Sequence, residues 1–183
     1  SKVAKEGKKL KIPIVGTNHF MPENFIHYLY PLNFGKKPLH KLAWRQFINV
    51  YKHLDLITTP TKTAAELIQN LGLKNSIIPI SNGIDLDRFN PKNNGHYLKK
   101  RFKISNVDKV VLTVGRLDKE KNTDILIKAF SLLPKNVHTK LVITGKGKEK
   151  SDLLKLAKKL GIESRIIFTG FIPDEELPLI YSV

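Results

Sequence analysis

Short apolar stretches rich in β-branched residues alternate along the chain with longer stretches that have helical periodicity. This alternation is typical of α/β proteins, in which helices connect the parallel strands of a sheet. We expect strands at 12–16, 55–59, 76–80, 109–114, 140–144 and 165–169. We expect helices at 1–9, 38–54, 63–71, 123–133 and 151–160, with another from residue 174.

Local signals refine the helices of the first half. One apolar stripe is expected to cover a sheet, formed by Leu39, Leu42, Ala43, Phe47, Val50, Tyr51 and Leu54. Thr63 and Glu66 have capping-box spacing, which predicts a helix start. Gly72 can take the left-handed conformation that follows a helix end.

Residues 81–107 contain Asn-Gly and Asn-Pro pairs and few periodic apolar residues, so they are predicted to connect two domains through one short helix. We therefore expect two Rossmann-like α/β domains with parallel sheets, at 1–103 and 104–183. The chain begins and ends inside expected helices, so both domains are expected to be incomplete.

Composition excludes several classes of protein. The net charge is +16, and residues 1–103 carry 18 lysines and arginines against 6 acidic residues. This balance favours partners with negative charge. The absence of cysteine excludes a disulfide scaffold, a thiolate metal site and a cysteine nucleophile.

The most informative loop follows the strand expected at 109–114 and reads Val-Gly-Arg-Leu-Asp-Lys-Glu-Lys-Asn over 114–122. In an open α/β sheet, ligands bind beyond the carboxyl ends of the strands. Gly115 would admit a ligand close to the backbone. Arg116 and Lys121 would place two cations on one loop, which suits a diphosphate. The same residues also fit a solvated loop with ordinary surface charge.

Paired glycines, Gly145 and Gly147, follow the strand expected at 140–144. They suit the close approach of a phosphate or sugar, or a plain tight turn. The loop matches neither the phosphate-loop motif nor the dinucleotide fingerprint, whose third glycine is replaced by Lys150.

A histidine follows the first expected strand in Thr17-Asn18-His19. Such a side chain can hydrogen-bond a substrate hydroxyl or stabilise developing charge. The alternative is that His19 is a loop residue with no functional role. The other histidines lack metal-ligand spacing. Asp85 and Asp87 superficially match a pair that holds a divalent ion, but they follow an Asn-Gly turn. We predict no metal site.

Residues 25–53 mix aromatic and basic side chains. Three interpretations stay open: a surface for anionic lipid, a surface for nucleic acid, and core aromatics beneath a solvated charged face.

Taken together, these loops resemble the retaining nucleotide-sugar glycosyltransferases of family 4, which have the two-domain GT-B fold. The resemblance covers nearly the whole chain. Five segments carry the resemblance, in the same order as in the family. They are Thr17-Asn-His19, Ser81-Asn-Gly-Ile-Asp85 with Phe89, the 114–121 loop with Ile127-x-Ala-Phe130, Gly145-x-Gly147, and Ile166–Phe171.

The resemblance implies a metal-independent hexosyltransferase that needs no cofactor besides its nucleotide-sugar substrate. The catalytic residues that it implies are His19, Arg116 and Lys121. The donor-binding residues that it implies are Gly115, Arg116, Lys121, Gly145, Gly147 and Phe171. Arg116 and Lys121 would bind the diphosphate and stabilise the leaving nucleoside diphosphate, with backbone near Phe171 meeting the base.

The family's Glu-x7-Glu pair would follow Val183, and its first glycine-rich loop would precede Ser1. We therefore expect this chain to be a fragment, inactive alone, of an active transferase.

The basic first half, its aromatic and basic stretch, and the likeness of residues 19–24 to lipid-glycosylating members favour a lipid-linked acceptor. They also favour a cytoplasmic protein that lies peripherally on the anionic inner membrane face. Two alternatives are kept: a basic nucleic-acid-binding module and a nucleotide-sugar epimerase. In the preferred interpretation nucleic acid is not a partner.

Overall fold

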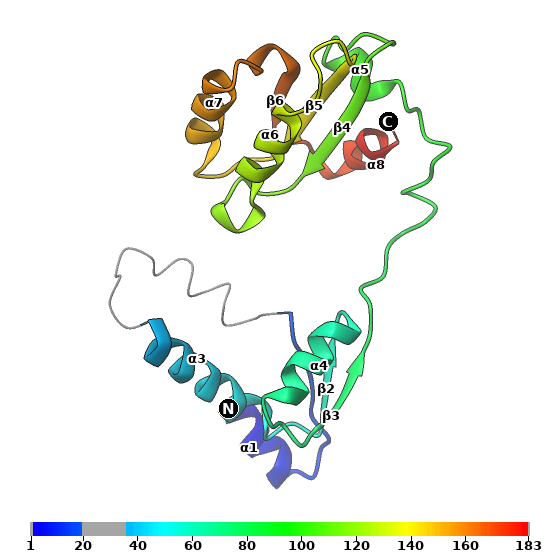
Figure 1. The fold of residues 1–183 in the computed structure, drawn as a ribbon. Coiled ribbons are helices and arrows are strands. Elements are labelled where there is room, and N and C mark those ends of the chain that lie inside the picture. The colour runs from blue at the N-terminus through cyan, green and yellow to red at the C-terminus, as the bar shows by residue number, and fades with distance from the viewer. Residues whose placement is uncertain (1, 20–35, 183) are drawn as a thin grey trace. The chain divides into compact units, whose positions relative to one another are not determined.

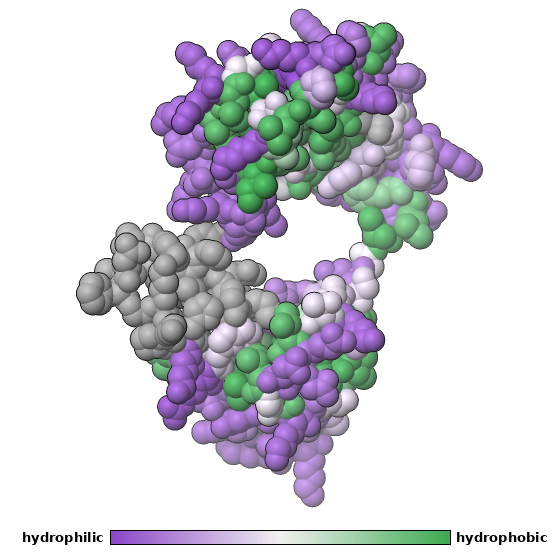
Figure 2. Space-filling model, viewed as in Figure 1, coloured by the Kyte–Doolittle hydropathy of each residue, from purple (hydrophilic) through white to green (hydrophobic). Residues whose placement is uncertain are grey.

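The computed structural model describes residues 2–19 and 36–182. These residues fall into two compact units, which divide between Gly83 and Ile84. Each unit holds a three-stranded parallel sheet, ordered β1-β2-β3 in the first and β4-β5-β6 in the second (Figure 1). The predicted α/β class with two parallel sheets is confirmed. On the face shown in Figure 2, each unit presents many hydrophilic side chains around smaller hydrophobic patches.

The elements of the first unit are α1 (Lys2–Lys9), β1 (Val15–Thr17), α3 (Lys36–Tyr51), β2 (Leu56–Thr59), α4 (Lys62–Asn70) and β3 (Ser76–Pro79). Its core is formed by Phe47, Ile57, Ile68 and Leu73, with Trp44, Ile48 and Tyr51 against it. The residues of α3 that pack inward are therefore Trp44, Phe47, Ile48 and Tyr51. Leu42 and Val50, which we expected in the apolar stripe, are exposed.

Two further expectations for this unit are wrong in detail. The first strand is short and Val15 is exposed, because β1 is paired only with β2 among the described strands. Helix α4 is capped by Thr61, not by the predicted pair at 63 and 66. The Thr61 hydroxyl accepts a hydrogen bond from the Ala64 amide at 3.1 Å, because the helix begins directly after Pro60 and Thr61.

The elements of the second unit are α5 (Tyr97–Arg101), β4 (Lys109–Val114), η2 (Lys119–Lys121), α6 (Thr123–Ser131), β5 (Thr139–Thr144), α7 (Lys150–Lys159), η3 (Glu163–Arg165), β6 (Ile166–Gly170), η4 (Asp174–Glu176) and α8 (Leu177–Tyr181). The predicted strands and helices of this half are present with ends that differ by one or two residues. Strand β4 begins and ends at the predicted residues.

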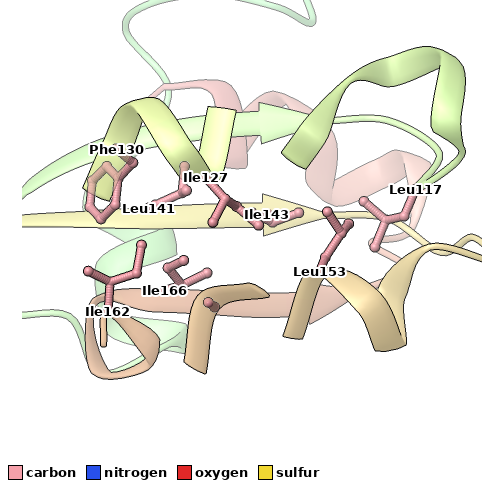
Figure 3. Packing of buried hydrophobic residues seen from close by; sticks show 9 residues of the cluster. Leu117, Ile127, Phe130, Leu141, Ile143, Leu153, Ile162 and Ile166 are labelled. Atoms are coloured by element: carbon pink, nitrogen blue, oxygen red, sulfur yellow. The ribbon is translucent and has the colours of Figure 1, made fainter. Parts of the chain in front are cut away.

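Strand β5 has a core on each face, because successive side chains of a strand point to opposite sides. Leu141 and Ile143 belong to the cluster beneath α6 and α7, shown in Figure 3, whereas Val142 packs with Leu98 and Ile180 on the other face. The second unit therefore has three layers, with helices on both sides of the sheet.

The division between the units lies earlier than the boundary that we expected after residue 103. Helix α5 belongs to the second unit because Leu98 and Ile104 are buried in its core. The connecting segment is tied to the same unit by an ion pair of 2.5 Å between Arg88 and Asp174. The interdomain connection is therefore shorter than its sequence indicates.

Candidate functional site

The three strands of the second sheet are parallel, so their carboxyl ends lie along one edge. Val114 is paired with Thr144, and Thr144 with Gly170. The loops that follow are joined by hydrogen bonds from the Gly115 amide to the Thr144 carbonyl at 3.0 Å and from the Gly145 amide to the Gly170 carbonyl at 2.8 Å. This edge is where α/β sheets bind ligands.

Two cavities open at this edge. The larger has a volume of about 410 Å³ and is lined by Val114, Gly115, Arg116, Thr144, Gly145, Lys146, Phe171, Ile172 and Leu177. The smaller, of about 80 Å³, is lined by Thr113, Val114, Gly115, Arg116, Leu117, Lys121, Thr123 and Thr144. Arg116 lines both cavities, and Lys121 lines the smaller one with it. The structure thus brings together Gly115, Arg116, Lys121, Gly145 and Phe171, all of which the sequence singled out.

The loop that carries Arg116 is anchored by its neighbour Leu117. The Leu117 side chain is buried in the core and lies at the same end of the cluster as Leu153 (Figure 3). Its amide donates to the Lys146 carbonyl at 2.8 Å, and its carbonyl accepts from the Glu149 amide at 3.0 Å. The buried anchor holds the exposed arginine beside it at the mouth of the site.

Arg116 forms two ion pairs within its own loop. Its side chain is 64% exposed, and one terminal nitrogen lies 2.9 Å from Asp118 Oδ2 while the other pairs with Glu120 Oε1. No role was predicted for either acid from the sequence. The available signal was their position, two and four residues after the arginine.

Gly145 and Gly147 lie where the loop after β5 packs against the loop after β4. Gly145 has a φ of +134°, and a Cβ atom there would lie 1.9 Å from the Gly115 carbonyl oxygen. A Cβ atom on Gly147 would lie 2.2 Å from the Leu117 carbonyl oxygen. The prediction that these glycines let the donor approach stays a prediction. In the structure, the atoms that lie closest to these two positions belong to the loop after β4.

Gly115 differs from these two, because no atom lies within 4 Å of the place where its Cβ would be. The backbone there faces open space beside both cavities. This position can therefore admit a bound group close to the main chain.

Phe171 is exposed on the wall of the larger cavity, with the Lys146 ammonium 5.5 Å from its ring centroid. A lysine over an aromatic face is a cation–π arrangement. Lys146 is a residue that the sequence analysis missed, although it stands between the two paired glycines.

His19 belongs to the first unit, where it is exposed just after β1. Its neighbour Asn18 is 1% exposed and accepts a 3.0 Å hydrogen bond from the Tyr51 hydroxyl. The backbone N–H of Asn18 also donates a hydrogen bond to the Thr58 carbonyl oxygen at 2.8 Å. Burial raises the pKa of Tyr51 above its ordinary value, so the hydroxyl stays a donor. Asn18 thus fixes the strand end that presents His19, whose catalytic role stays a prediction.

The other candidates of the sequence analysis have structural explanations or lie elsewhere. Asp85 Oδ1 accepts from the amides of Asp87 and Arg88 at 3.1 and 3.0 Å, so it closes a turn. Residues 20–35, which include the first part of the aromatic and basic stretch and positions 20–24 of the likeness at 19–24, lie outside the described residues. Within the described ranges, no three or more acidic or histidine side chains are grouped to hold a metal ion. No described helix combines the length and apolarity that crossing a bilayer requires.

Comparison with known families matches both halves of the chain. Residues 2–88 match the model described as Glycosyltransferase Family 4, and residues 97–183 match the model described as Glycosyl transferases group 1. Residues 89–96, which neither model matches, lie between the two ranges.

Curated relatives align with almost the whole chain. Alpha-monoglucosyldiacylglycerol synthase of Streptococcus pneumoniae is 28% identical over 96% of this chain and 40% of its own length. Mannosylfructose-phosphate synthase of Agrobacterium fabrum is 30% identical over 94% of this chain and 42% of its own length. The chain therefore spans about two fifths of the length of these relatives.

Solved structures share the fold. HepE of Anabaena, solved in complex with UDP, superposes with a TM-score of 0.75 at 20% identity, over 97% of this chain and 46% of that one. WaaG, a glycosyltransferase of lipopolysaccharide biosynthesis, superposes with a TM-score of 0.66 at 21% identity, over 96% of this chain and 53% of that one. The elements of both units thus match those of GT-B glycosyltransferases.

Proposed function

The chain belongs to the glycosyltransferases of family 4, and we propose that its protein moves a hexosyl group from a nucleotide-sugar donor to an acceptor hydroxyl with retention of anomeric configuration. The observation that carries the proposal is the pair of cations, Arg116 and Lys121, that line one cavity at the carboxyl edge of the second sheet. The family membership favours this function over the nucleic-acid-binding module and the epimerase.

The chemistry of sugar transfer explains why two cations would lie there. When the bond between the sugar and the diphosphate breaks, negative charge develops on the departing phosphate oxygens. A guanidinium and an ammonium that are already in place stabilise this charge more in the transition state than in the bound donor. In this proposal the chain's own cations neutralise the diphosphate, and the reaction needs no metal cofactor.

The surrounding residues suit the rest of a nucleotide sugar. Open space above Gly115 would admit the phosphates, and the larger cavity beside Phe171 would hold the nucleoside. His19 at the end of β1 would act toward the transferred sugar, as the family resemblance implies. Gly145 would contribute by holding the two loops together.

Calorimetric titration of the chain with UDP, GDP and ADP tests the donor site. At least one should bind with a dissociation constant of about 1 μM to 1 mM, the range in which the KM values of enzymes commonly fall. The Arg116→Ala/Lys121→Ala double variant should bind that ligand at least about tenfold more weakly, by analogy with the loss of charge-assisted hydrogen bonds. Lys155→Ala, which removes an exposed cation on α7, is the matched control. Equal binding by the double variant and the control would contradict the proposal.

We infer further that the acceptor is lipid-linked and that the protein lies peripherally on the cytoplasmic membrane face. Two observations support this inference: the excess positive charge of residues 1–103, and the diacylglycerol-glucosylating relatives from Streptococcus pneumoniae and Acholeplasma laidlawii. Basic surfaces bind anionic lipid headgroups through charge that salt screens.

Co-sedimentation with liposomes tests the membrane surface. The chain should sediment with vesicles that contain phosphatidylglycerol and stay in the supernatant with pure phosphatidylcholine vesicles, and 0.5 M salt at about a 4 Å screening length should release it. Binding that is equal for both vesicles and insensitive to salt would remove the charge argument.

A further inference from the structure

The arginine of the site is paired with two carboxylates from its own loop. One terminal nitrogen of Arg116 lies 2.9 Å from Asp118, and the other pairs with Glu120. Each end of the guanidinium fork thus has its own anionic partner. An arginine side chain has many rotamers, and paired partners restrict it to few of them.

The two carboxylates are themselves held firmly. The Asp118 and Glu120 side chains are only 16% and 19% exposed, whereas that of Arg116 is 64% exposed. Glu120 lies in the short helix η2, where the Lys121 amide donates to the Asp118 carbonyl at 2.9 Å. Leu117 fixes the start of this turn in the core. The acids therefore lie shielded on a turn that the core anchors, and the arginine is their exposed partner.

The position of these acids is unfavourable unless they act through the arginine. A carboxylate beside a diphosphate site repels the ligand. Because the Arg116 side chain is 64% exposed, solvent screens both ion pairs and limits what they add to folding stability. Orientation of the guanidinium gives the pair of acids a function that offsets the repulsion.

We propose that Glu120 and Asp118 are positioning residues that aim the Arg116 guanidinium at the donor diphosphate. The inference rests on the proposed function and adds to it the groups that set the geometry of the phosphate contact. In the bound state, the guanidinium lies between the carboxylates and the phosphates, so that it screens one set of negative charges from the other. Without the arginine, the same acids only repel the ligand.

A double-mutant cycle on UDP affinity tests this inference, with GDP or ADP used if it is the ligand that the wild-type chain binds. Glu120→Ala should weaken binding roughly three- to tenfold in the wild-type background, in the range of measured coupling between contacting groups. In the Arg116→Ala background, the same substitution should leave binding unchanged or make it tighter, because only repulsion is removed. Glu120→Gln keeps an acceptor oxygen and should bind more tightly than Glu120→Ala. Glu163→Ala, on η3, is the control acid in the same unit and should have no effect.

The outcomes distinguish failure of the positioning role from failure of the proposed diphosphate contact. If Arg116→Ala weakens binding but Glu120→Ala does not, the positioning role is wrong and the proposed function stands. If Glu120→Ala weakens binding equally in both backgrounds, Glu120 supports only the loop, and the positioning role is again wrong. If Arg116→Ala itself leaves binding unchanged, the diphosphate contact and the positioning role are both wrong. Thermal unfolding of each variant shows that the loop still folds, and Glu120→Gln provides the comparison should Glu120→Ala be unstable.

Discussion

Replacing Arg116 or Lys121 with alanine should lower the turnover of the complete protein by roughly 10²-fold or more, with a smaller change in KM. Each cation would stabilise charge that appears on the leaving diphosphate in the transition state, and loss of one such pre-placed donor costs about this much in other enzymes. Both residues line the same small cavity, so their effects should not be additive. Steady-state release of nucleoside diphosphate measures the effect.

Two controls belong with this experiment. Lys155→Ala removes an exposed cation from the middle of α7 in the same unit and should leave turnover unchanged. Arg116→Lys keeps the charge but loses the planar fork, and should recover only part of the activity. Turnover that is unchanged in both Arg116→Ala and Lys121→Ala would leave these residues as surface charges.

Gly145→Ala should be strongly destabilising, by about 2–4 kcal/mol, because two separate costs combine. The φ of +134° is one that side chains rarely adopt, and the new methyl would overlap the Gly115 carbonyl oxygen at 1.9 Å. Relief of this overlap requires the loop that carries Arg116 to move. The variant should therefore lose nucleoside diphosphate binding together with stability. Calorimetric unfolding and the UDP titration measure the two effects.

Two other glycines give the matched controls. Gly83→Ala faces open space and should change stability by less than about 0.5 kcal/mol. Gly115→Ala also has open space, so it should fold normally, yet it should weaken binding because the methyl occupies the place proposed for the phosphates. A Gly145→Ala variant as stable as Gly83→Ala would show that the junction between the two loops tolerates a side chain.

The order of elements could be predicted from the sequence because each strand and helix has its own apolar period. The match is best in the second unit, where β5 is covered on both faces and burial follows the pattern. It is poorer for β1, whose apolar residues predicted burial. In the structure Val15 is exposed at the edge of the sheet. Burial depends on the neighbours of a strand as well as on its sequence.

The candidate site was predicted in part for a similar reason. Topology alone places the ends of parallel strands at one edge, so Gly115, Arg116 and Gly145 could be expected to meet. The contacts between loops could not be predicted, because they depend on the backbone path. The ion pairs of Arg116 and the overlap that a side chain on Gly147 would meet are both of this kind. Lys146 was missed because only the fold brings it over Phe171.

The most direct test of the account is a crystal structure of the chain with bound UDP, or with whichever nucleoside diphosphate the titrations identify. The decisive distances are those from the terminal nitrogens of Arg116 and from Lys121 Nζ to the phosphate oxygens. We expect both cations to lie within about 3.2 Å of those oxygens, the range of charge-assisted hydrogen bonds. A diphosphate bound elsewhere, with both side chains directed into solvent, would contradict it.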